Sequence, residues 1–365
     1  MKKLWKEYKI VIILFIAWRV LLGVIEWVAP FMWVLRDGFL GPLRWANFDG
    51  VHYLSIARNG YYTYEQAFFP LYPMLIHWVS RFPLPDDITV ALAISHISFL
   101  GGVLLFYDLA RSISRRSALW CVVFLLLFPT SFFFASAYTE SLFFLLSAAC
   151  MVAARRKLWW LAGIAGMLAS GTRLFGIFLF PVVLWQYVKE QKGVYKWWDI
   201  FFVSLIPLGL LAYMRYLMQT IGDPLAFFHV QSAFGAGRSG RELILLPQVL
   251  WRYMRIIVTV APSSIIYAIS VFELAVFSFG LWLVWYGFRK KIINAEYLAY
   301  ALAILMVPTF TGTFSSLPRY FLSAFPLFFI LGSVHNTGIK VAIGVLFTIL
   351  LIAFGAAFLQ GYFVA

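Results

Sequence analysis

Long apolar stretches, separated by short polar or basic segments, run along almost the whole chain. A helix needs about 20 predominantly apolar residues to cross the hydrocarbon core of a bilayer. The pattern predicts eleven membrane spans, at about 8–30, 88–112, 117–135, 138–154, 158–172, 174–188, 197–218, 263–288, 295–311, 320–335 and 341–362. Some spans are short, so we expect tilted, re-entrant or broken helices. The chain is therefore predicted to be an all-α polytopic membrane protein with a single transmembrane domain, 1–365.

Two segments between the predicted spans, 31–87 and 219–262, are long enough to build a site. Both are rich in aromatic residues and proline, so we expect ordered interfacial helices at the membrane surface. In the first segment Pro70 and Pro73 stand three residues apart, and this spacing predicts a turn without a regular helix. We expect these two loops to form the active-site face.

Composition excludes a soluble enzyme. Hydrophobic residues make up 63% of the 365 residues and charged residues 12%, against about a quarter charged in soluble domains. The apolar run Ile10–Val28 is too long for a signal peptide and has no small-residue cleavage site after it, so we expect a retained first span. Cys121 and Cys150 both lie inside apolar runs, where a disulfide is implausible.

The net charge of +14 reports membrane orientation rather than nucleic-acid binding. We place the N-terminus and every lysine on the cytoplasmic side. The basic residues expected there are Lys2, Lys3, Lys6, Lys9, Arg111, Arg115, Arg116, Arg155, Arg156, Lys157, Lys189, Lys192, Lys196, Arg289, Lys290, Lys291 and Lys340.

The opposite, outer face carries arginines alone. They are Arg36, Arg44, Arg58, Arg81, Arg173, Arg238, Arg241, Arg252, Arg255 and Arg319. Guanidinium groups suit bidentate recognition of phosphate or carboxylate, so this pattern indicates an anionic ligand at the outer surface. The alternative for individual arginines is snorkelling toward lipid headgroups.

The first loop contains a candidate general base. Asp49 is expected to begin a helix that Asn47 or Asp49 itself caps and that Gly60 ends. The side chains expected on its helical face are those of His52, Tyr53 and Ile56. A carboxylate on a short interfacial helix, among aromatic rings and beside His52, is desolvated enough to accept a proton. The alternative is that Asp49 only caps the helix.

Three more ionisable residues stand at predicted outer ends of spans, namely Glu140, Arg173 and Arg319. An ionisable group at membrane depth is a functional candidate because its burial is costly. The alternatives are a structural ion pair between Glu140 and Arg173, and an interfacial anchor for Arg319.

The chain has neither a phosphate-binding glycine loop followed by Lys-Ser/Thr nor a His/Cys spacing typical of a metal site. No metal or other cofactor is therefore expected. A site on the outer face has no access to cytosolic nucleotides, so a lipid phosphate is the natural carrier of an activated group. The outer arginines would bind its phosphate.

At these residues the sequence resembles the PIG-V family of GPI mannosyltransferase 2 and its prokaryotic relatives, within the GT-C superfamily. The matching blocks are Phe48–Ala57 with Gly60-Tyr61, Ala67–Pro73, Pro129–Ser131 with Tyr138–Phe143, and Ser170–Arg173 with Pro318–Tyr320. The resemblance implies a GT-C-like helical bundle in a prokaryotic cell membrane. It implies inverting transfer of mannose from polyprenyl-phosphate mannose to a lipid-linked acceptor, without a metal, at the non-cytoplasmic face.

The same resemblance implies roles for individual residues. Asp49 would be the catalytic base, with Glu140 as the runner-up. Arg319 or Arg173 would neutralise the departing lipid phosphate. The residues expected to orient sugar or acceptor hydroxyls are His52, Tyr53 and Glu140.

Two other functions could account for some of these residues. A transporter or flippase of lipid-linked anionic sugars would employ the outer arginines, but it predicts an internal repeat and ionisable groups near mid-membrane in both halves. A membrane O-acyltransferase would use His52 as its base and would need a path for an acyl donor from the cytosol.

Overall fold

The computed structural model describes residues 2–39, 41–82, 86–191, 193 and 195–364. This part of the chain is helical and contains no β-strand. Lys192 lies outside the described residues, as do the side chains of Lys2, Lys3 and Lys6.

The α-helices are α1 (Lys2–Met32), α2 (Asp49–Asn59), α3 (Leu71–Val79), α4 (Asp87–Ile113), α5 (Ala118–Leu127), α6 (Glu140–Arg155), α7 (Trp159–Thr172), α8 (Leu179–Gln191), α9 (Trp197–Ser204), α10 (Leu208–Ile221), α11 (Ala226–His229), α12 (Leu246–Thr259), α13 (Ile265–Lys290), α14 (Ala295–Met306), α15 (Leu317–Tyr320), α16 (Pro326–Gly332) and α17 (Thr337–Leu359). The 3₁₀ helices are η1 (Gly41–Ala46), η2 (Glu65–Ala67), η3 (Ser131–Ala135), η4 (Leu174–Phe178), η5 (Val230–Phe234) and η6 (Val307–Thr311).

Among the described residues, four helices are long and apolar enough to cross a membrane: α1 from Glu7, α4, α13 and α17. The pair α9 and α10, which is bent by 46° at its break, makes a fifth if it is one span. The chain is thus an integral membrane protein. Helices also begin in the other predicted spans but are shorter, for example α5 and α14. The count of eleven spans therefore stays a prediction.

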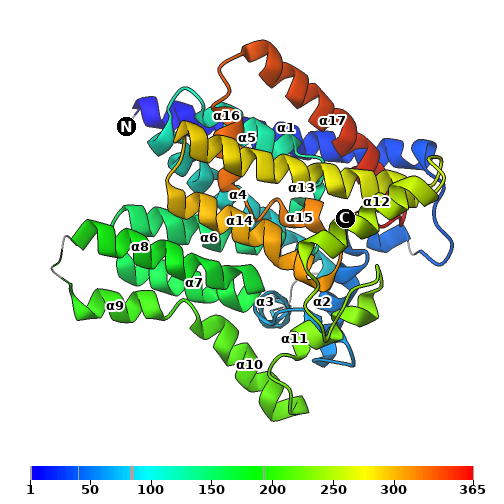
Figure 1. Cartoon of the computed structure of the whole chain (residues 1–365), viewed down its shortest axis with the longest axis horizontal. Coiled ribbons are helices and arrows are strands. Elements are labelled where there is room, and N and C mark those ends of the chain that lie inside the picture. Colours follow the sequence, from blue (N-terminus) through cyan, green and yellow to red (C-terminus); the bar gives the residue numbers. More distant parts are fainter. Residues whose placement is uncertain (1, 40, 83–85, 192, 194, 365) are drawn as a thin grey trace.

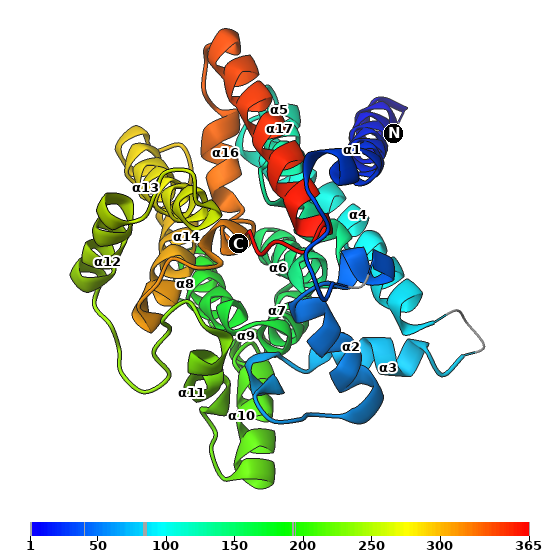
Figure 2. The same ribbon diagram turned by 90° about the vertical axis from the view of Figure 1, so that its right-hand side faces the viewer.

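The centre of the bundle is a row of three helices, in which α6 packs between α4 and α7. On one flank α1 packs against α17 and α5 against α16, and on the other α9 and α10 pack against α7 (Figure 1 and Figure 2). The contact of α7 with α10 depends on a glycine, because a Cβ at Gly209 would lie 2.1 Å from the carbonyl oxygen of Met167. This close packing fixes the end of α7, where Arg173 follows.

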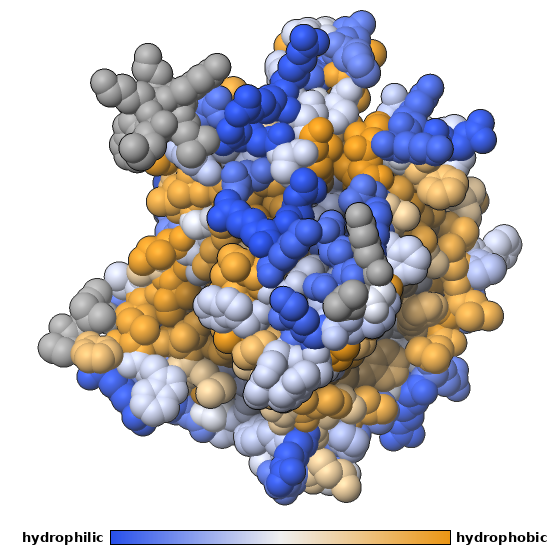
Figure 3. Space-filling view, turned by 90° about the vertical axis from the view of Figure 1, so that its left-hand side faces the viewer, coloured by the Kyte–Doolittle hydropathy of each residue, from blue (hydrophilic) through white to orange (hydrophobic). Residues whose placement is uncertain are grey.

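The two ends of the bundle differ in character. The N-terminus and the α8–α9 and α13–α14 connections lie at the left of Figure 1, whereas α2, α11 and the C-terminus lie toward the right. We call the left end the basic end, because it exposes basic side chains, among them those of Lys189, Arg289 and Lys290. Viewed directly, this end shows a concentration of hydrophilic side chains with apolar flanks (Figure 3). The assignment of this end to the cytoplasm stays a prediction.

The expectation of no regular helix around the two prolines was wrong. Pro70 precedes α3 as its N-cap, and Pro73 lies in the first turn of this helix. The N–H groups of a first turn have no partner within the helix, so a proline there loses no hydrogen bond. Cys121 and Cys150 are free and buried, as expected.

Candidate active site

The helix that carries Asp49 begins and ends as the sequence indicates, but its cap differs. Asp49 is the first residue of α2, and Gly60, with φ 78°, ends the helix. The N-cap is Phe48, with φ 52° and no side-chain capping bond, so the expected cap by Asn47 or Asp49 was wrong. The amide of Asn47 instead donates to the carbonyl oxygen of Phe358 at 3.1 Å. This bond ties the start of α2 to the C-terminal helix α17.

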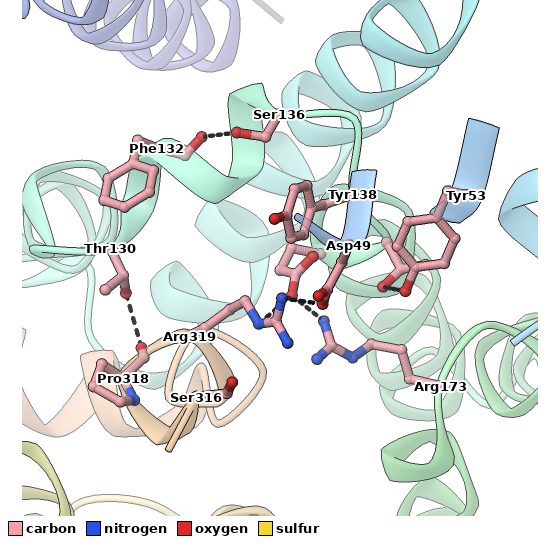
Figure 4. Close-up of polar contacts among 12 residues, drawn as sticks. Asp49, Tyr53, Thr130, Phe132, Ser136, Tyr138, Arg173, Ser316, Pro318 and Arg319 are labelled. Atoms are coloured by element: carbon pink, nitrogen blue, oxygen red, sulfur yellow. Dashed lines mark hydrogen bonds and ion pairs between the residues drawn. The ribbon is translucent and has the colours of Figure 1, made fainter. Parts of the chain in front are cut away.

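Four charged side chains form one continuous network near the start of α2 (Figure 4). Arg319 donates a hydrogen bond to the carboxylate of Asp49, and its Nε lies 3.4 Å from Oε1 of Glu140. Arg173 donates to the same Glu140 oxygen. The network thus joins residues from α2, α6, the end of α7 and α15, which are up to 270 positions apart in the sequence.

The position of Arg319 is fixed by the residues around it. Its guanidinium carbon lies 5.3–5.5 Å from the ring centroids of Phe133, Tyr138 and Tyr320. The hydroxyl of Thr130 donates to the carbonyl oxygen of Pro318 at 2.8 Å, and this bond anchors the preceding backbone (Figure 4). The aromatic rings contribute cation–π attraction and exclude water, so the cation is held rigidly.

A hydrogen bond also connects the loop before α6 to the segment that precedes α2. The hydroxyl of Tyr138 donates to the carbonyl oxygen of Asn47 at 2.7 Å. The sequence blocks around residues 47–53, 130–141 and 318–320 thus meet in space, although none of their individual motifs is specific.

The charges fix the protonation state of Asp49. Burial alone would raise the pKa of this carboxyl, but the charge of Arg319 and its hydrogen bond outweigh that effect and lower the pKa below its usual value. Burial raises the pKa of Tyr53, and the nearby carboxylates of Asp49 and Glu140 raise it further. At neutral pH, Asp49 is therefore ionised and Tyr53 is a neutral hydroxyl.

A cavity of about 210 Å³ opens in front of this network. Four of the six candidate site residues line it, namely Asp49, Tyr53, Arg173 and Arg319. Nine of its 22 lining residues are aromatic, among them Phe68 and Phe69 from the first long loop and Phe227, Phe228 and Phe234 from the second. An apolar cavity with a few convergent charged groups is typical of a small-molecule site.

The other two candidates lie outside the cavity wall. The side chain of Glu140 is 1% exposed and lies behind the wall, against both arginines. His52 is 39% exposed, and its Nδ1 lies 3.3 Å from Oε1 of Glu65. The His52 ring stacks on Phe68 at 4.9 Å between centroids, so it supports an aromatic wall rather than facing Asp49.

Sequence reasoning did not place Arg238 among the site residues, although it counted this arginine on the outer face. Arg238 lines the cavity and donates to the hydroxyls of Ser316 at 3.0 Å and Ser315 at 3.4 Å. Within the described part of the chain, no carboxylate forms an ion pair with it. The available signal was a lone arginine in the glycine-rich segment 235–240 of the second loop.

Among the residues that the structure describes, no group of three or more His, Cys, Asp or Glu side chains is arranged to hold a metal ion. The expectation of a reaction without a metal stays a prediction. The charged groups that face the cavity are one carboxylate and three guanidinium groups, with Glu140 behind them. This arrangement can bind an anion beside a proton acceptor.

The fold is that of the GT-C membrane glycosyltransferases. It is similar to the crystal structure of ArnT from Cupriavidus metallidurans bound to undecaprenyl phosphate, with a TM-score of 0.50 and 14% sequence identity. The likeness covers 91% of this chain and 62% of the ArnT chain, so this protein spans about three fifths of the length of that structure.

The chain belongs to the mannosyltransferase (PIG-V) family, whose model matches residues 34–221. The match includes Asp49, Glu140 and Arg173 and ends before Arg238 and Arg319. No curated protein matches the chain. Family and fold are thus both ones found among membrane glycosyltransferases.

Proposed function

We propose that this protein transfers mannose from polyprenyl-phosphate mannose to a lipid-linked glycan or glycolipid, with inversion, at the non-cytoplasmic face of the membrane. Asp49 is the general base of this reaction. The family supports the sugar, and the lipid phosphate bound to ArnT supports the class of donor. The cavity is lined by arginines and by no lysine among the described residues, and this charge pattern supports a site on the non-cytoplasmic face.

The balance of charge in the cavity carries the proposal. Arg173, Arg238 and Arg319 contribute three positive charges, and the carboxylates of Asp49 and Glu140 contribute two negative ones. The surplus of one positive charge matches the single negative charge of a sugar phosphodiester. Arg238, which has no carboxylate partner among the described residues, is the natural first contact for that phosphate.

The chemical step needs one proton acceptor and one stabilised leaving group. The oxygen of the acceptor hydroxyl attacks the anomeric carbon, and its proton passes to a carboxylate oxygen of Asp49. The bond from the anomeric carbon to the phosphate oxygen breaks, and the lipid phosphate departs with the electron pair. The guanidinium groups stabilise the charge that develops on the phosphate, an effect of about 100-fold or more in rate for a well-placed donor.

Donor binding would also prepare the base. Arg319 lowers the pKa of Asp49 through a direct hydrogen bond, and in that pairing the carboxylate is a weak proton acceptor. A phosphate that shares Arg319 weakens this bond, so the pKa of Asp49 rises toward its ordinary value. Asp49 thereby becomes a better base only when the donor is in place.

The remaining candidate residues have supporting roles. The hydroxyl of Tyr53, 3.3 Å from that of Thr139, faces the cavity and can orient a sugar hydroxyl. Glu140 contacts both arginines, so its removal would leave Arg173 without its carboxylate partner and Arg319 with Asp49 alone. His52 supports the aromatic wall through Phe68. Asp49 is therefore favoured over Glu140 as the base, because only Asp49 reaches the cavity surface.

The test is a transfer assay with purified protein in lipid nanodiscs, radiolabelled polyprenyl-phosphate mannose and a membrane lipid extract as the acceptor source. We expect labelled product from the wild type and none above background from Asp49→Asn. The control is Asp223→Asn, because Asp223 pairs with His229 and is not among the cavity-lining residues. Equal product from wild type and Asp49→Asn would remove Asp49 as the base. Movement of intact donor across the bilayer without transfer would indicate a flippase.

A further inference from the structure

Glu273 is a carboxyl group buried inside the bundle that the proposed reaction does not use. It lies on the membrane-spanning helix α13, and only 4% of its surface is exposed. Burying an ionisable side chain within a membrane is costly, so such a residue is a candidate for a functional role. It accepts a hydrogen bond from the hydroxyl of Tyr253, which lies on the neighbouring helix α12.

The hydroxyl of Tyr253 also holds the segment that precedes α15. It accepts the backbone N–H of Phe314 at 3.0 Å, and it lies 3.1 Å from the hydroxyl oxygen of Thr313. That threonine oxygen in turn accepts the backbone N–H of Ser315 at 3.0 Å. Because the single proton of the phenol goes to Glu273, the hydroxyl of Thr313 donates to Tyr253. Every donor in this chain of hydrogen bonds therefore points toward Glu273, which is the final acceptor.

The segment before α15 needs this support because its backbone is strained. Ser316 has φ 67°, a left-handed conformation that residues with a side chain rarely adopt. Such a conformation persists only where the surrounding contacts hold it. The rings of Tyr253 and Phe277 pack on Phe314, with centroids 4.6 Å and 4.4 Å away. Polar and apolar contacts from α12 and α13 thus fix the segment together.

The same segment provides the hydrogen-bond acceptors of Arg238. The guanidinium group donates to the hydroxyl of Ser316 at 3.0 Å and to that of Ser315 at 3.4 Å. Arg319 follows Ser316 by three residues, and both lie beside the charged network (Figure 4). A shift of this segment would therefore move Arg238 relative to the rest of the site.

The residue next to Tyr253 on α12 fixes the other side of this junction. One nitrogen of Arg252, Nη1, donates to the carbonyl oxygens of Gly237 at 2.9 Å and Gly312 at 2.8 Å. Gly237 directly precedes Arg238, and Gly312 stands just before the segment that Tyr253 holds. Helix α12 thus binds both stretches of chain that meet at Arg238.

We propose that Glu273 and Tyr253 are positioning residues of the transfer reaction. Their hydrogen bonds order the segment before α15, and this segment holds the guanidinium group of Arg238 at the cavity. The inference rests on the proposed function, in which Arg238 meets the phosphate of the donor. Neither Glu273 nor Tyr253 is among the residues that line the cavity, so both act through Arg238 rather than on the substrate.

Two conservative variants separate the hydroxyl from the carboxyl group. Tyr253→Phe removes the hydroxyl and leaves Glu273 in place, whereas Glu273→Gln keeps an oxygen that can accept from Tyr253. The matched control is Tyr187→Phe at the basic end. The buried hydroxyl of Tyr187 accepts the N–H of Lys196 at 2.8 Å and donates to the carbonyl oxygen of the same residue at 3.0 Å. Tyr187 does not line the cavity, so the control loses the same kind of bond outside the site.

Transfer from polyprenyl-phosphate mannose is measured in nanodiscs, in the wild-type and Arg238→Ala backgrounds. We expect Tyr253→Phe to lower kcat/KM by about tenfold and Glu273→Gln by less than about threefold. With Arg238 removed, Tyr253→Phe should change kcat/KM by less than about twofold, because the residue that it positions is gone. Tyr187→Phe should stay within about twofold of the wild type. An equal loss from Tyr253→Phe in both backgrounds, or a loss no larger than that of the control, would overturn the proposal.

Hydrogen–deuterium exchange tests the ordering of the segment without any transfer reaction. In Tyr253→Phe the N–H of Phe314 loses its acceptor, so a peptide that covers residues 313–316 should exchange faster than in the wild type. Tyr187→Phe should leave the exchange of this peptide unchanged. Unchanged exchange in Tyr253→Phe would overturn the positioning role. Absence of transfer by the wild type would instead contradict the proposed function, and the exchange result would still decide whether Tyr253 orders the segment.

Discussion

Arg319 connects the two carboxylates of the site, and its contacts set what each of them can do. It hydrogen-bonds Asp49 and lies 3.4 Å from Glu140, and three aromatic rings surround it. Neither carboxylate is therefore an isolated buried charge. Removing this one cation would leave Glu140 with Arg173 alone and Asp49 with no direct cationic partner.

A pH profile tests the coupling between Asp49 and Arg319. Because Arg319 lowers the pKa of Asp49, the acid limb of kcat/KM should lie below the ordinary pKa range of a carboxyl group. In Arg319→Gln the pKa of Asp49 rises, so the limb should move to higher pH. The stabilising effect of the ion pair is fully present above the unfolded-state pKa of about 3.9 and is lost as the pH falls through the lowered pKa.

Arg319→Gln should also lower kcat, because a hydrogen-bond donor to the leaving phosphate is lost. The acid limbs of wild type and Arg319→Gln are compared in the same nanodisc assay. An unchanged acid limb would mean that a group other than Asp49 controls it.

A variant of Arg238 tests phosphate binding without removing either ion pair of the charged network. Among the described hydrogen bonds, the guanidinium group of Arg238 donates only to serine hydroxyls, so Arg238→Ala should spare the Asp49–Arg319 and Glu140–Arg173 pairs. We expect kcat/KM for the donor to fall by on the order of 100-fold, with little change in thermal unfolding. Arg238→Lys should recover part of this loss, because it restores the charge but not the bidentate geometry. A full rate with Arg238→Ala would exclude a role at the phosphate.

At the scale of elements, the end of α7 shows how packing places a charged residue. Arg173 follows directly after α7, and Gly209 on α10 touches the backbone of that helix near Met167 and Gly171. Any side chain at Gly209 would push α10 away from α7. The position of Arg173, and hence its ion pair with Glu140, depends on this contact.

Gly209→Ala should therefore destabilise the protein. The added Cβ would lie 2.1 Å from one backbone oxygen, and overpacking of this kind costs about 1–3 kcal/mol. Thermal unfolding in detergent measures the effect, and activity should fall with stability. Gly23→Ala in α1 is the control, because a Cβ there meets nothing within 4 Å. A melting temperature of Gly209→Ala equal to that of Gly23→Ala would contradict the close contact.

Local sequence signals located the elements of the site better than their details. The polar cluster at Asp49 and the glycine at position 60 gave both ends of α2. The cap could not be predicted, because Asn47 is drawn away by Phe358, which is 311 residues distant. The helix through Pro73 was missed because a proline in a first turn and a proline in a helix interior look alike without a known start.

The same limit applies to the residues of the site. An outer position and a charged side chain were enough to select Asp49, Arg173 and Arg319, which line one cavity. They could not show that His52 turns toward Glu65 or that Arg238 reaches the cavity, because both depend on how a long loop folds back. Periodicity and charge report where a segment lies, not which partner it meets.

For the whole molecule, the two ends of the bundle define a test of orientation. We expect a cysteine introduced at Ser232, in the second long loop, to react with a membrane-impermeant maleimide in intact cells. A cysteine at Lys189, at the basic end, should react only after permeabilisation. Both positions are exposed, whereas the native Cys121 and Cys150 are buried and should give little background. The reverse labelling pattern would place the cavity on the cytoplasmic side.

The surplus positive charge of the cavity also bears on the timing of turnover. When Asp49 has taken the acceptor proton, the surrounding charge rises by one, just as the departing lipid phosphate gains a second negative charge. The spent carrier is therefore held more tightly than the donor until that proton escapes. Release of the lipid phosphate would then follow loss of the proton from Asp49. A proton acceptor in the surrounding buffer should therefore accelerate successive rounds of catalysis.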